Sequence, residues 1–570
     1  MLFACGIQRI LLQLRERHPS LLSLWYLDDG HLVGELPALN SCYVEVPVAF
    51  QAVGLRVNPR KCHLFTLGDL THVPMLQQHA THQREGITVL GTPVGSEGYI
   101  RQSLSSKFRG VHDFVTKVTH LGDPQIAVAL LRMCAGACRV VHLLRTVPPD
   151  LVAPFAQELD STMLDALQQV AGVPLTETAA LQVFLPHRLG GLGLQLARPQ
   201  CATAFLTAFV AFRTPEAEAF PQMPLELVQL ATGEVSRALE MMACEVAPAE
   251  ASSMAWLKEA LSTSPVRPLP DQGNLWWWNE RRANHAYEQV LRSASARDCA
   301  RLRCQADSEA GSWLQACPSS GLGLRLNPTE FMVLLRWWLG IPLVPADTSL
   351  SCPSCGDSMD CFGDHLLCCK LGGFWTRHKA IVDMLYHFGR AAGLTVTLEV
   401  AIGGLERPAD LMFSPWKGSG PLAVDPAVVH PLAPSTSYAA IKNGSEAIEF
   451  KARVKSNHYS EKCSESNVQF APFVLSTFGK MGDDARDLLR DLAKARRGVG
   501  TLTPEAVLVH QYQQQLQVVL RRQVARMLLQ GVGDIQEISL PPPIRRLEYE
   551  DKEAGFRVWV VDELGCNVAQ

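Results

Sequence analysis

A short stretch from Cys352 to Cys369 contains the clearest metal-binding pattern in the chain. Cys352 and Cys355 are separated by two residues, the spacing at which two thiolates can hold one tetrahedral zinc ion. His365 and Cys369 lie one helical turn apart, so on a helix they share a face and can complete the coordination. Cys368 is a spare thiol without that offset. Four protein ligands leave no open position, so we expect this zinc ion to organise the fold rather than to catalyse.

Two isolated acids follow on predicted strands. Asp410 lies in the apolar segment 407–413 and Asp425 in the apolar segment 422–429, with a turn rich in Gly and Pro between them. A carboxylate inside an apolar strand is costly unless a charged group satisfies it, and one shared cation would satisfy both. Pro426 removes a ladder donor directly after Asp425, which suits a functional edge or bulge. The alternative is a pair of aspartates that face solvent.

A helix that carries lysines is predicted downstream of the two acids. Lys451, Lys455 and Tyr459 recur every four residues and therefore share one helical face. Hydrolysis of a phosphodiester needs a cation that polarises the phosphate and an amine or base that orients the attacking water. A lysine on this face could have the second role, and a solvated basic face is the alternative. The predicted strand 394–400, before the acids, carries one further acid, Glu399.

The N-terminal part of the chain contains a second pair of acids. Asp28 and Asp29 follow the apolar residues 24–27 and precede Gly30, which predicts a β-hairpin whose tip could hold a divalent cation. A helix-like segment comes next, and then a turn that contains Lys61. The alternative is a solvated hairpin turn.

A cluster of arginines follows three consecutive tryptophans, Trp276 to Trp278. Arg281, Arg282 and Arg292, with three further arginines up to Arg303, are predicted to lie on one helix. Arginines can pair with phosphates while bases stack on aromatic rings, so these residues are candidates for binding single-stranded nucleic acid. The alternative is a charged outer face beside a buried aromatic cluster, because three consecutive tryptophans cannot all face one side of a helix.

The composition places these patterns in a globular chain of several domains. The chain has 570 residues, whereas single hydrophobic cores stop growing at roughly 250 to 300 residues. Its 47% hydrophobic and 19% charged residues are typical of a soluble protein rather than a disordered one. The net charge of −4 does not indicate a nucleic-acid partner, although a local basic stripe would be sufficient.

No targeting signal or membrane span is predicted. Charged residues interrupt the apolar N-terminus, and the apolar run 125–144 carries Arg132 and Arg139, so it predicts a core helix rather than a membrane helix. In the absence of an export signal, the 17 cysteines are expected to be thiols and metal ligands in a reducing compartment.

The N-terminal motifs resemble the second half of a reverse transcriptase palm from non-LTR retrotransposons. That resemblance rests on Asp28 and Asp29, Lys61 and the Leu-Gly-Thr-Pro-Val-Gly segment 90–95, in this order. It implies that the two aspartates bind catalytic magnesium ions and that Lys61 lies near the incoming nucleotide. Two-metal phosphoryl transfer needs a further bridging carboxylate. The only acid before Tyr26 is Glu16, in a predicted helix, so we expect residues 1–100 to be a truncated palm that cannot polymerise unaided.

Residues 352–473 resemble the zinc knuckle and restriction-like endonuclease of site-specific non-LTR retrotransposons, in which the catalytic lysine has moved to a helix. This resemblance implies that Asp410 and Asp425 bind magnesium. It favours Lys455 as the catalytic lysine because of its position relative to Tyr459, and it leaves Lys451 as the reserve. Glu399 is implied as a further metal ligand.

We therefore expect an α+β multidomain chain. Its expected parts are a truncated reverse transcriptase palm (1–100), a thumb-like helical domain (101–200), a helical connector (201–345), a zinc knuckle (346–380), a restriction-endonuclease-like α/β core (381–500) and a helical C-terminal extension and tail (501–570).

The resemblance implies a retrotransposon-derived protein with magnesium-dependent DNA nicking, structural zinc and an incomplete RNA-directed DNA polymerase. The implied partners are a DNA target and an RNA template, with no small-molecule substrate beyond nucleotides, in the nucleus. The alternative is a catalytically inactive remnant that still binds nucleic acid.

Overall fold

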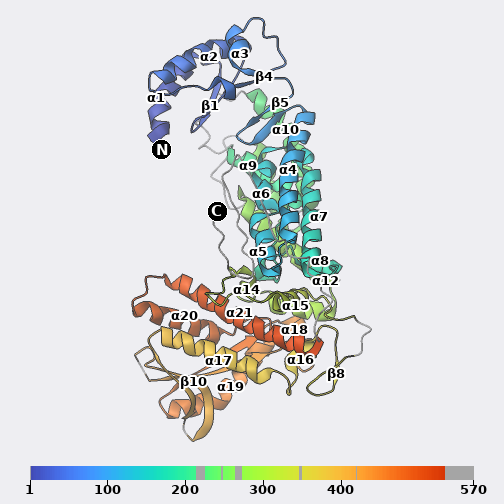
Figure 1. Ribbon diagram of the computed structural model, residues 1–570, viewed down its shortest axis with the longest axis vertical. Coiled ribbons are helices and arrows are strands. Elements are labelled where there is room, and N and C mark those ends of the chain that lie inside the picture. Colours follow the sequence, from blue (N-terminus) through green and yellow to red (C-terminus); the bar gives the residue numbers. More distant parts are fainter. Residues whose placement is uncertain are drawn as a thin grey trace, which may run out of the picture. The chain divides into compact units, whose positions relative to one another are not determined.

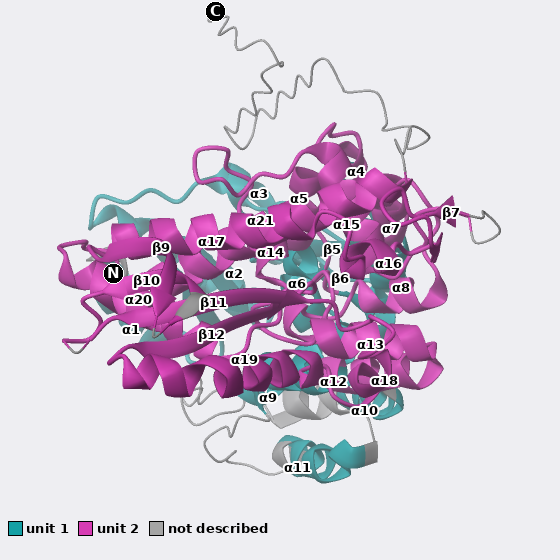
Figure 2. Ribbon diagram, turned by 90° about the horizontal axis from the view of Figure 1, so that it is seen from below, with its two compact units in different colours: residues 1–113, 137–161, 196–282 teal, residues 114–136, 162–195, 283–570 magenta. Residues whose placement is uncertain are grey.

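The computed structural model describes residues 2–212, 225–245, 248–262, 273–345, 350–402, 404–418 and 420–532. These residues form many helices and several small sheets, which confirms the expected α+β class (Figure 1). Two compact units, each assembled from three separate segments, divide the chain (Figure 2). Unit 1 contains residues 1–113, 137–161 and 196–282, and unit 2 contains residues 114–136, 162–195 and 283–570. The six segments expected from the sequence divide the chain differently, and their boundaries stay predictions.

Unit 1 begins with helix α1, continues with short strand pairs and ends with helices. Its first elements are α1 (Leu2–Arg17), β1 (Leu22–Tyr26), β2 (Asp29–Val33), α2 (Leu36–Gln51), η1 (Pro59–Lys61), β3 (His63–Phe65), α3 (Pro74–His79), β4 (Thr81–Gln83), β5 (Gly86–Val89) and β6 (Thr92–Gly95). Its later elements are α6 (Ala137–Thr146), η3 (Arg198–Gln200), α9 (Cys201–Phe212), α10 (Leu225–Glu245), η5 (Pro248–Glu250) and α11 (Ala251–Ser262). Three helices, α4 (Glu97–Thr119), α7 (Pro149–Ala171) and α12 (Leu275–Ser293), contribute residues to both units.

The expected hairpin around Asp28 and Asp29 is present. β1 and β2 pair antiparallel, from Leu22 opposite Val33 to Tyr26 opposite Asp29. The hairpin packs on one small core that includes residues of α1 and α2, where Trp25 stacks on Phe50 with ring centroids 5.2 Å apart. In the described part of residues 1–100, the strands form three separate two-stranded sheets instead of one continuous sheet.

The apolar run 125–144 contains two helices. α5 (Pro124–Cys134) and α6 are separated at Gly136, which has a φ of +68°. The expectation of one continuous helix was therefore wrong, because Gly136 takes a left-handed conformation that other residues avoid. By length and composition alone, the stretch Pro124–Thr146 is apolar enough to cross a membrane. Of its 18-residue apolar window, 44% is buried within the protein. Buried helices of soluble proteins pass the same test, and the absence of a membrane partner stays a prediction.

Unit 2 contains the zinc-knuckle motif and a four-stranded sheet. Before the motif come α5, α8 (Glu177–Gln182), η2 (His187–Leu189), α13 (Ala296–Gln305), α14 (Ser312–Gln315) and α15 (Pro328–Trp338). From the motif onward come β7 (Leu350–Ser351), β8 (Ser358–Met359), α16 (Asp364–Cys368), α17 (Phe374–Ala391), β9 (Thr395–Ile402), β10 (Leu405–Ser414), β11 (Leu422–Val429), α18 (Ser437–Lys442), α19 (Glu446–Glu465), β12 (Gln469–Ser476), α20 (Asp483–Gly498) and α21 (Glu505–Val532).

The four strands lie in the order β12-β11-β10-β9. β9, β10 and β11 pair antiparallel, whereas β12 pairs parallel to β11 after a crossover through α18 and α19. Leu411 on β10 and Val424 on β11 are fully buried. The side chains next to them along each strand point to the opposite face of the sheet, because successive residues of a strand alternate. Figure 2 shows α17 on one side of β11 and β12 and α19 on the other.

α21 covers the helices on the α17 side of this sheet. It contacts α15, α17 and α20 along its length. Leu516, Leu520 and Val524 recur every four residues along α21 and are fully buried, so they form one apolar face of this helix. The remainder of the expected C-terminal tail, residues 533–570, lies outside the described residues.

The glycine-rich segment 185–194 allows a close approach between backbone and neighbouring atoms. A Cβ atom on Gly191 would lie 1.9 Å from the carbonyl oxygen of Leu185. A Cβ atom on Gly193, which has a φ of +71°, would lie 2.6 Å from the His187 ring. His187 is consequently enclosed by backbone that only glycine permits.

Candidate functional site

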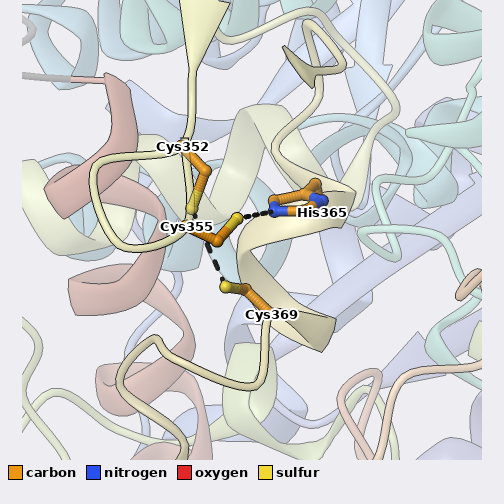
Figure 3. A group of neighbouring side chains, drawn as sticks. All are labelled: Cys352, Cys355, His365 and Cys369. Carbon is orange, nitrogen blue, oxygen red and sulfur yellow. Dashed lines mark hydrogen bonds between the residues drawn. The ribbon is translucent and has the colours of Figure 1, made fainter. Parts of the chain in front are cut away.

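The zinc-knuckle motif brings its four expected ligands together. The ligand atoms of Cys352, Cys355, His365 and Cys369 all lie within 4.8 Å of one another, and their side chains converge in Figure 3. The Sγ atoms of Cys352 and Cys369 are 3.8 Å apart, and the Cys355 Sγ lies 3.2 Å from the His365 Nε2. Thiolate and imidazole ligands at these separations suit one tetrahedral ion, so this cluster could hold a metal such as zinc.

Local structure explains why the four ligands meet. Cys352 follows β7 in a tight hairpin with β8, and the Gly356 N–H donates to the Cys352 carbonyl oxygen. His365 lies in the first turn of α16, and Cys369 is the C-cap of this short helix. The Cys368 thiol instead points to the carbonyl oxygens of Asp364 and His365. The structure therefore selects Cys369 over Cys368, as the helical offset predicts.

The environment of Cys352 favours its thiolate. Burial would raise the pKa of this thiol, but the backbone N–H groups of Ser354 and Cys355 lower it to about 6. A cysteine must be deprotonated to bind zinc, so a thiol with a low pKa is already prepared to be a ligand.

Asp364, the residue before His365, connects the knuckle to the rest of unit 2. Its carboxylate lies 2.7 Å from the Arg297 Nε and 3.6 Å from the His430 Nε2. The Trp337 Nε1–H donates to the same group over 3.4 Å. Burial alone would raise the pKa of Asp364, but His430 and Arg297 hold it well below its usual range. His430 follows β11, so this ion cluster connects the knuckle helix to the strand that carries Asp425.

Asp410 and Asp425 are neighbours across two antiparallel strands. The register places Leu411 opposite Val424. Because the strands are antiparallel, Asp410, one residue before Leu411, lies beside Asp425, one residue after Val424. Both carboxylates are largely buried, with 30% and 13% of their side chains exposed. The expectation that the two acids converge is therefore confirmed in geometry, and their catalytic role stays a prediction.

Lys455 reaches the acids from α19. Its ammonium group forms an ion pair with the Asp425 carboxylate, and only 12% of the lysine side chain is exposed. Burial raises the pKa of Asp425, Lys455 opposes that shift, and the nearby Asp410 carboxylate adds to it. For Asp410, burial also favours a higher pKa, but a hydrogen bond from His378 reverses the shift and lowers the pKa. The two pKa values are shifted in opposite directions. This is typical of two carboxylates that share a buried site, because their like charges repel and one of them keeps its proton more readily.

Tyr459 lies one turn after Lys455 and packs beside the same acids. Its ring belongs to the small core under β10 and β11 and lies 5.5 Å from the Phe470 ring. Burial raises the pKa of Tyr459, and the negative charges of Asp425 and Asp410 raise it further. Lys455 and Tyr459 thus lie together on the helical face predicted from their spacing.

Lys451 and Glu399 are placed differently. Lys451, one turn before Lys455, is half-buried on α19. Glu399 is exposed on β9, where its φ of +52° interrupts the extended strand. The pairs that flank it, Leu398 with Leu411 and Val400 with Ala409, place Glu399 in line with Asp410 along the neighbouring strand. Its role as a further metal ligand stays a prediction.

His378 is a residue of this site that sequence reasoning missed. It lies on α17, and its Nε2 is 3.2 Å from the Oδ2 of Asp410. Its ring stacks on Trp375, with ring centroids 5.8 Å apart and an angle of 27° between the planes. The histidine lies 32 positions before Asp410 in the chain, and no motif connects the two residues. Only the fold of α17 against the sheet places them together.

The polymerase-like motif is more open. Asp28 and Asp29 are exposed at the tip of the β1–β2 hairpin, as predicted. Lys61 ends η1, whose N-cap is Asn58 with its side chain accepting from the Arg60 N–H. In the part of the chain that the structure describes, Asp28 and Asp29 do not form a group with a third metal-ligating side chain. Their role and that of Lys61 stay predictions.

The prediction that one helix carries all six arginines after the three tryptophans is wrong. The tryptophans lie within α12, which ends at Ser293, and the later arginines belong to α13. Arg281 pairs with Glu250 over 3.0 Å and lies over the Trp277 ring.

The other two candidate arginines differ in exposure. Arg282 donates to the Asn279 and Thr203 side chains and is half-buried, whereas Arg292 is exposed. Arg281 and Arg282 thus already have partners within unit 1, and nucleic-acid binding by the three arginines stays a prediction.

No protein-family model matches this chain, and a search of curated proteins found no matching relative.

Proposed function

We propose that unit 2 contains a magnesium-dependent DNA endonuclease whose site is formed by Asp410, Asp425 and Lys455. The observation that carries this proposal is the convergence of two acids from neighbouring strands with an amine from the following crossover helix. Besides Lys455, this largely buried carboxylate pair has His378 as a basic partner, and a divalent cation would supply further positive charge.

The two carboxylates fit magnesium by their chemistry. They offer hard oxygen ligands, and magnesium commonly takes one or two carboxylates and completes its shell with water and substrate phosphate. Bound there, the ion would polarise the scissile phosphate and favour the deprotonation of an attacking water. The cysteine cluster has soft ligands and is assigned to a structural zinc ion.

Lys455 has two roles in this proposal. In the protein alone, its ammonium neutralises part of the charge on Asp425. With DNA bound, the same group is suited to hold a phosphate oxygen or to orient the attacking water. In this proposal the Tyr459 hydroxyl, on the same helical face, would donate a hydrogen bond to a phosphate oxygen, and its raised pKa keeps the proton on it at neutral pH.

The N-terminal motif belongs to the same proposal as an incomplete polymerase. Asp28, Asp29 and Lys61 would be the remnant of a reverse transcriptase site that binds nucleic acid but does not extend a primer unaided. The proposed partners are a DNA target and an RNA template, and the proposed location is the nucleus, all by resemblance to non-LTR retrotransposon proteins.

Nicking of supercoiled plasmid DNA by the full chain tests the proposal. We expect nicking in magnesium that is lost in Asp410→Asn and Asp425→Asn, because the substitution keeps the shape of each side chain and removes its charge. Asp383→Asn, which changes an exposed carboxylate of α17, is the matched control and should nick normally. DNA binding without nicking, unchanged by the two site variants, would instead favour the inactive nucleic-acid-binding remnant.

A further inference from the structure

Each of the two acids is held by a basic side chain from a different helix. The Lys455 ammonium contacts the Oδ2 of Asp425 from α19, and the His378 Nε2 lies 3.2 Å from the Oδ2 of Asp410 from α17. In both contacts the basic group meets one carboxylate oxygen, and the two carboxylates also lie within hydrogen-bond reach of each other. His378 therefore stands to Asp410 as Lys455 stands to Asp425.

A hydrogen bond of this kind decides how a carboxylate can act as a ligand. Outer partners fix the orientation of a ligating carboxylate, and their loss typically lowers metal affinity by about 10- to 100-fold. Asp410 is the more exposed of the two acids, with 30% of its side chain exposed against 13% for Asp425. It consequently has more freedom to turn toward water and gains more from an external anchor.

Trp375 gives the His378 ring a fixed place. The indole stacks on the imidazole from one turn earlier on α17, although 66% of this tryptophan is exposed. Stacking limits rotation of the imidazole about its side-chain bonds and keeps the Nε2 directed at Asp410.

We propose that His378 is a positioning residue that orients Asp410 for cation binding and that Trp375 holds the His378 ring in place. This inference rests on the proposed function, because it assumes that Asp410 and Asp425 bind a divalent cation. It assigns to α17 a part in the site that neither the spacing of the acids nor the lysine helix indicates.

Binding of Mn²⁺ to the full chain, followed by electron paramagnetic resonance, tests this inference without relying on activity. We expect His378→Ala to weaken Mn²⁺ binding by about 10- to 100-fold. His378→Gln should recover most of the affinity, because the glutamine amide can donate a hydrogen bond from nearly the same position as the Nε2. Trp375→Ala should weaken binding less than His378→Ala, and Trp375→Phe should retain the stack and the affinity.

His387→Ala is the matched control, since His387 is an exposed histidine on the same helix. It should bind Mn²⁺ as the unmodified protein does. Wild-type affinity in His378→Ala, together with lost binding in Asp425→Asn, would overturn this inference and leave the proposed endonuclease standing. No difference between the unmodified chain and Asp425→Asn would overturn both. Equal losses in His378→Ala and His378→Gln would also overturn it, because a merely structural role would not be rescued by a hydrogen-bond donor.

Discussion

Lys455 and Asp425 form an ion pair although they lie 30 positions apart and belong to a helix and a strand, respectively. Only 12% and 13% of their side chains are exposed, so water screens the pair weakly. The pair exists because α19 crosses from β11 to the parallel strand β12 and contacts both strands. Crossover geometry thus delivers the amine to an acid on a neighbouring element.

Replacement of Lys455 by alanine should abolish most nicking. The variant loses the amine that we propose to contact the reacting phosphate or water, and loss of one preorganised charged group typically costs about 100- to 1,000-fold in rate. It also leaves a buried carboxylate without its partner, which can cost about 3–5 kcal/mol of stability. Single-turnover nicking and thermal unfolding measure the two effects separately.

Lys451→Ala provides the comparison for that variant. Lys451 lies one turn earlier on the same helix. Its replacement by alanine therefore changes helix propensity and net charge by the same amount as Lys455→Ala does. We expect nearly normal nicking in this variant. A large loss in Lys451→Ala with little loss in Lys455→Ala would exchange the roles of the two lysines.

Removal of a single zinc ligand should release the metal. Cys369→Ser is expected to lose the zinc ion, because the Cys369 Sγ belongs to the four-atom ligand cluster. Cys368→Ser should retain it, since that thiol points to backbone carbonyl oxygens of α16. Native mass spectrometry of the two variants gives the zinc content directly. Loss of zinc in Cys368→Ser with retention in Cys369→Ser would contradict the ligand assignment.

Neutralisation of Asp364 should destabilise unit 2. Asp364→Ala removes the carboxylate shared by Arg297, Trp337 and His430 and leaves the largely buried Arg297 guanidinium with only its longer contact to Asp298, over 3.8 Å. The expected cost is about 3–5 kcal/mol, measured as a shift in the denaturation midpoint. Asp487→Ala is the surface comparison, because its pair with Arg490 is mostly exposed and should be worth less than about 1 kcal/mol. Equal effects of the two substitutions would remove Asp364 from its proposed structural role.

The four residues that could hold a metal ion could be predicted from the sequence because they all lie within one short stretch. Spacing alone then determines which side chains share a turn or a helical face. The two acids could be predicted because an isolated carboxylate in an apolar strand needs a partner. His378 could not, since its contact with Asp410 depends on how α17 packs against the sheet.

The arginine prediction failed for a local reason that the sequence does contain. Ser295 is the N-cap of α13, and its side chain accepts from the Asp298 N–H. A serine followed three residues later by an acid is a helix-start signal, so the sequence indicates a break after Ser293. Arg301 on the second helix is fully buried and donates to the Trp338 carbonyl oxygen. Such tertiary partners are not visible in a pattern of charges.

Protonation of His187 should weaken unit 2 at acid pH. Burial, with the Arg132 guanidinium beside it, lowers the pKa of His187 to about 3 from a usual value near 6.5. The Arg132 Nη1 lies 3.3 Å from the His187 Nε2, a contact in which the neutral imidazole accepts the hydrogen bond. The unfolded chain therefore binds a proton at a higher pH than the folded chain. The stabilisation is complete above about pH 6.5 and falls as the pH drops toward 3, by up to about 1.4 kcal/mol per pH unit.

His187→Gln removes the titrating group and keeps an oxygen that can accept from Arg132. We expect its unfolding free energy to depend less on pH than that of the unmodified chain between about pH 6.5 and pH 4, because no proton binds preferentially to the unfolded glutamine. Above pH 7 the two proteins should differ only by a constant offset, since His187 is then neutral in both states. Denaturation midpoints measured at matched pH values give the comparison. Two parallel curves across the whole acid range would show that His187 does not link protonation to folding.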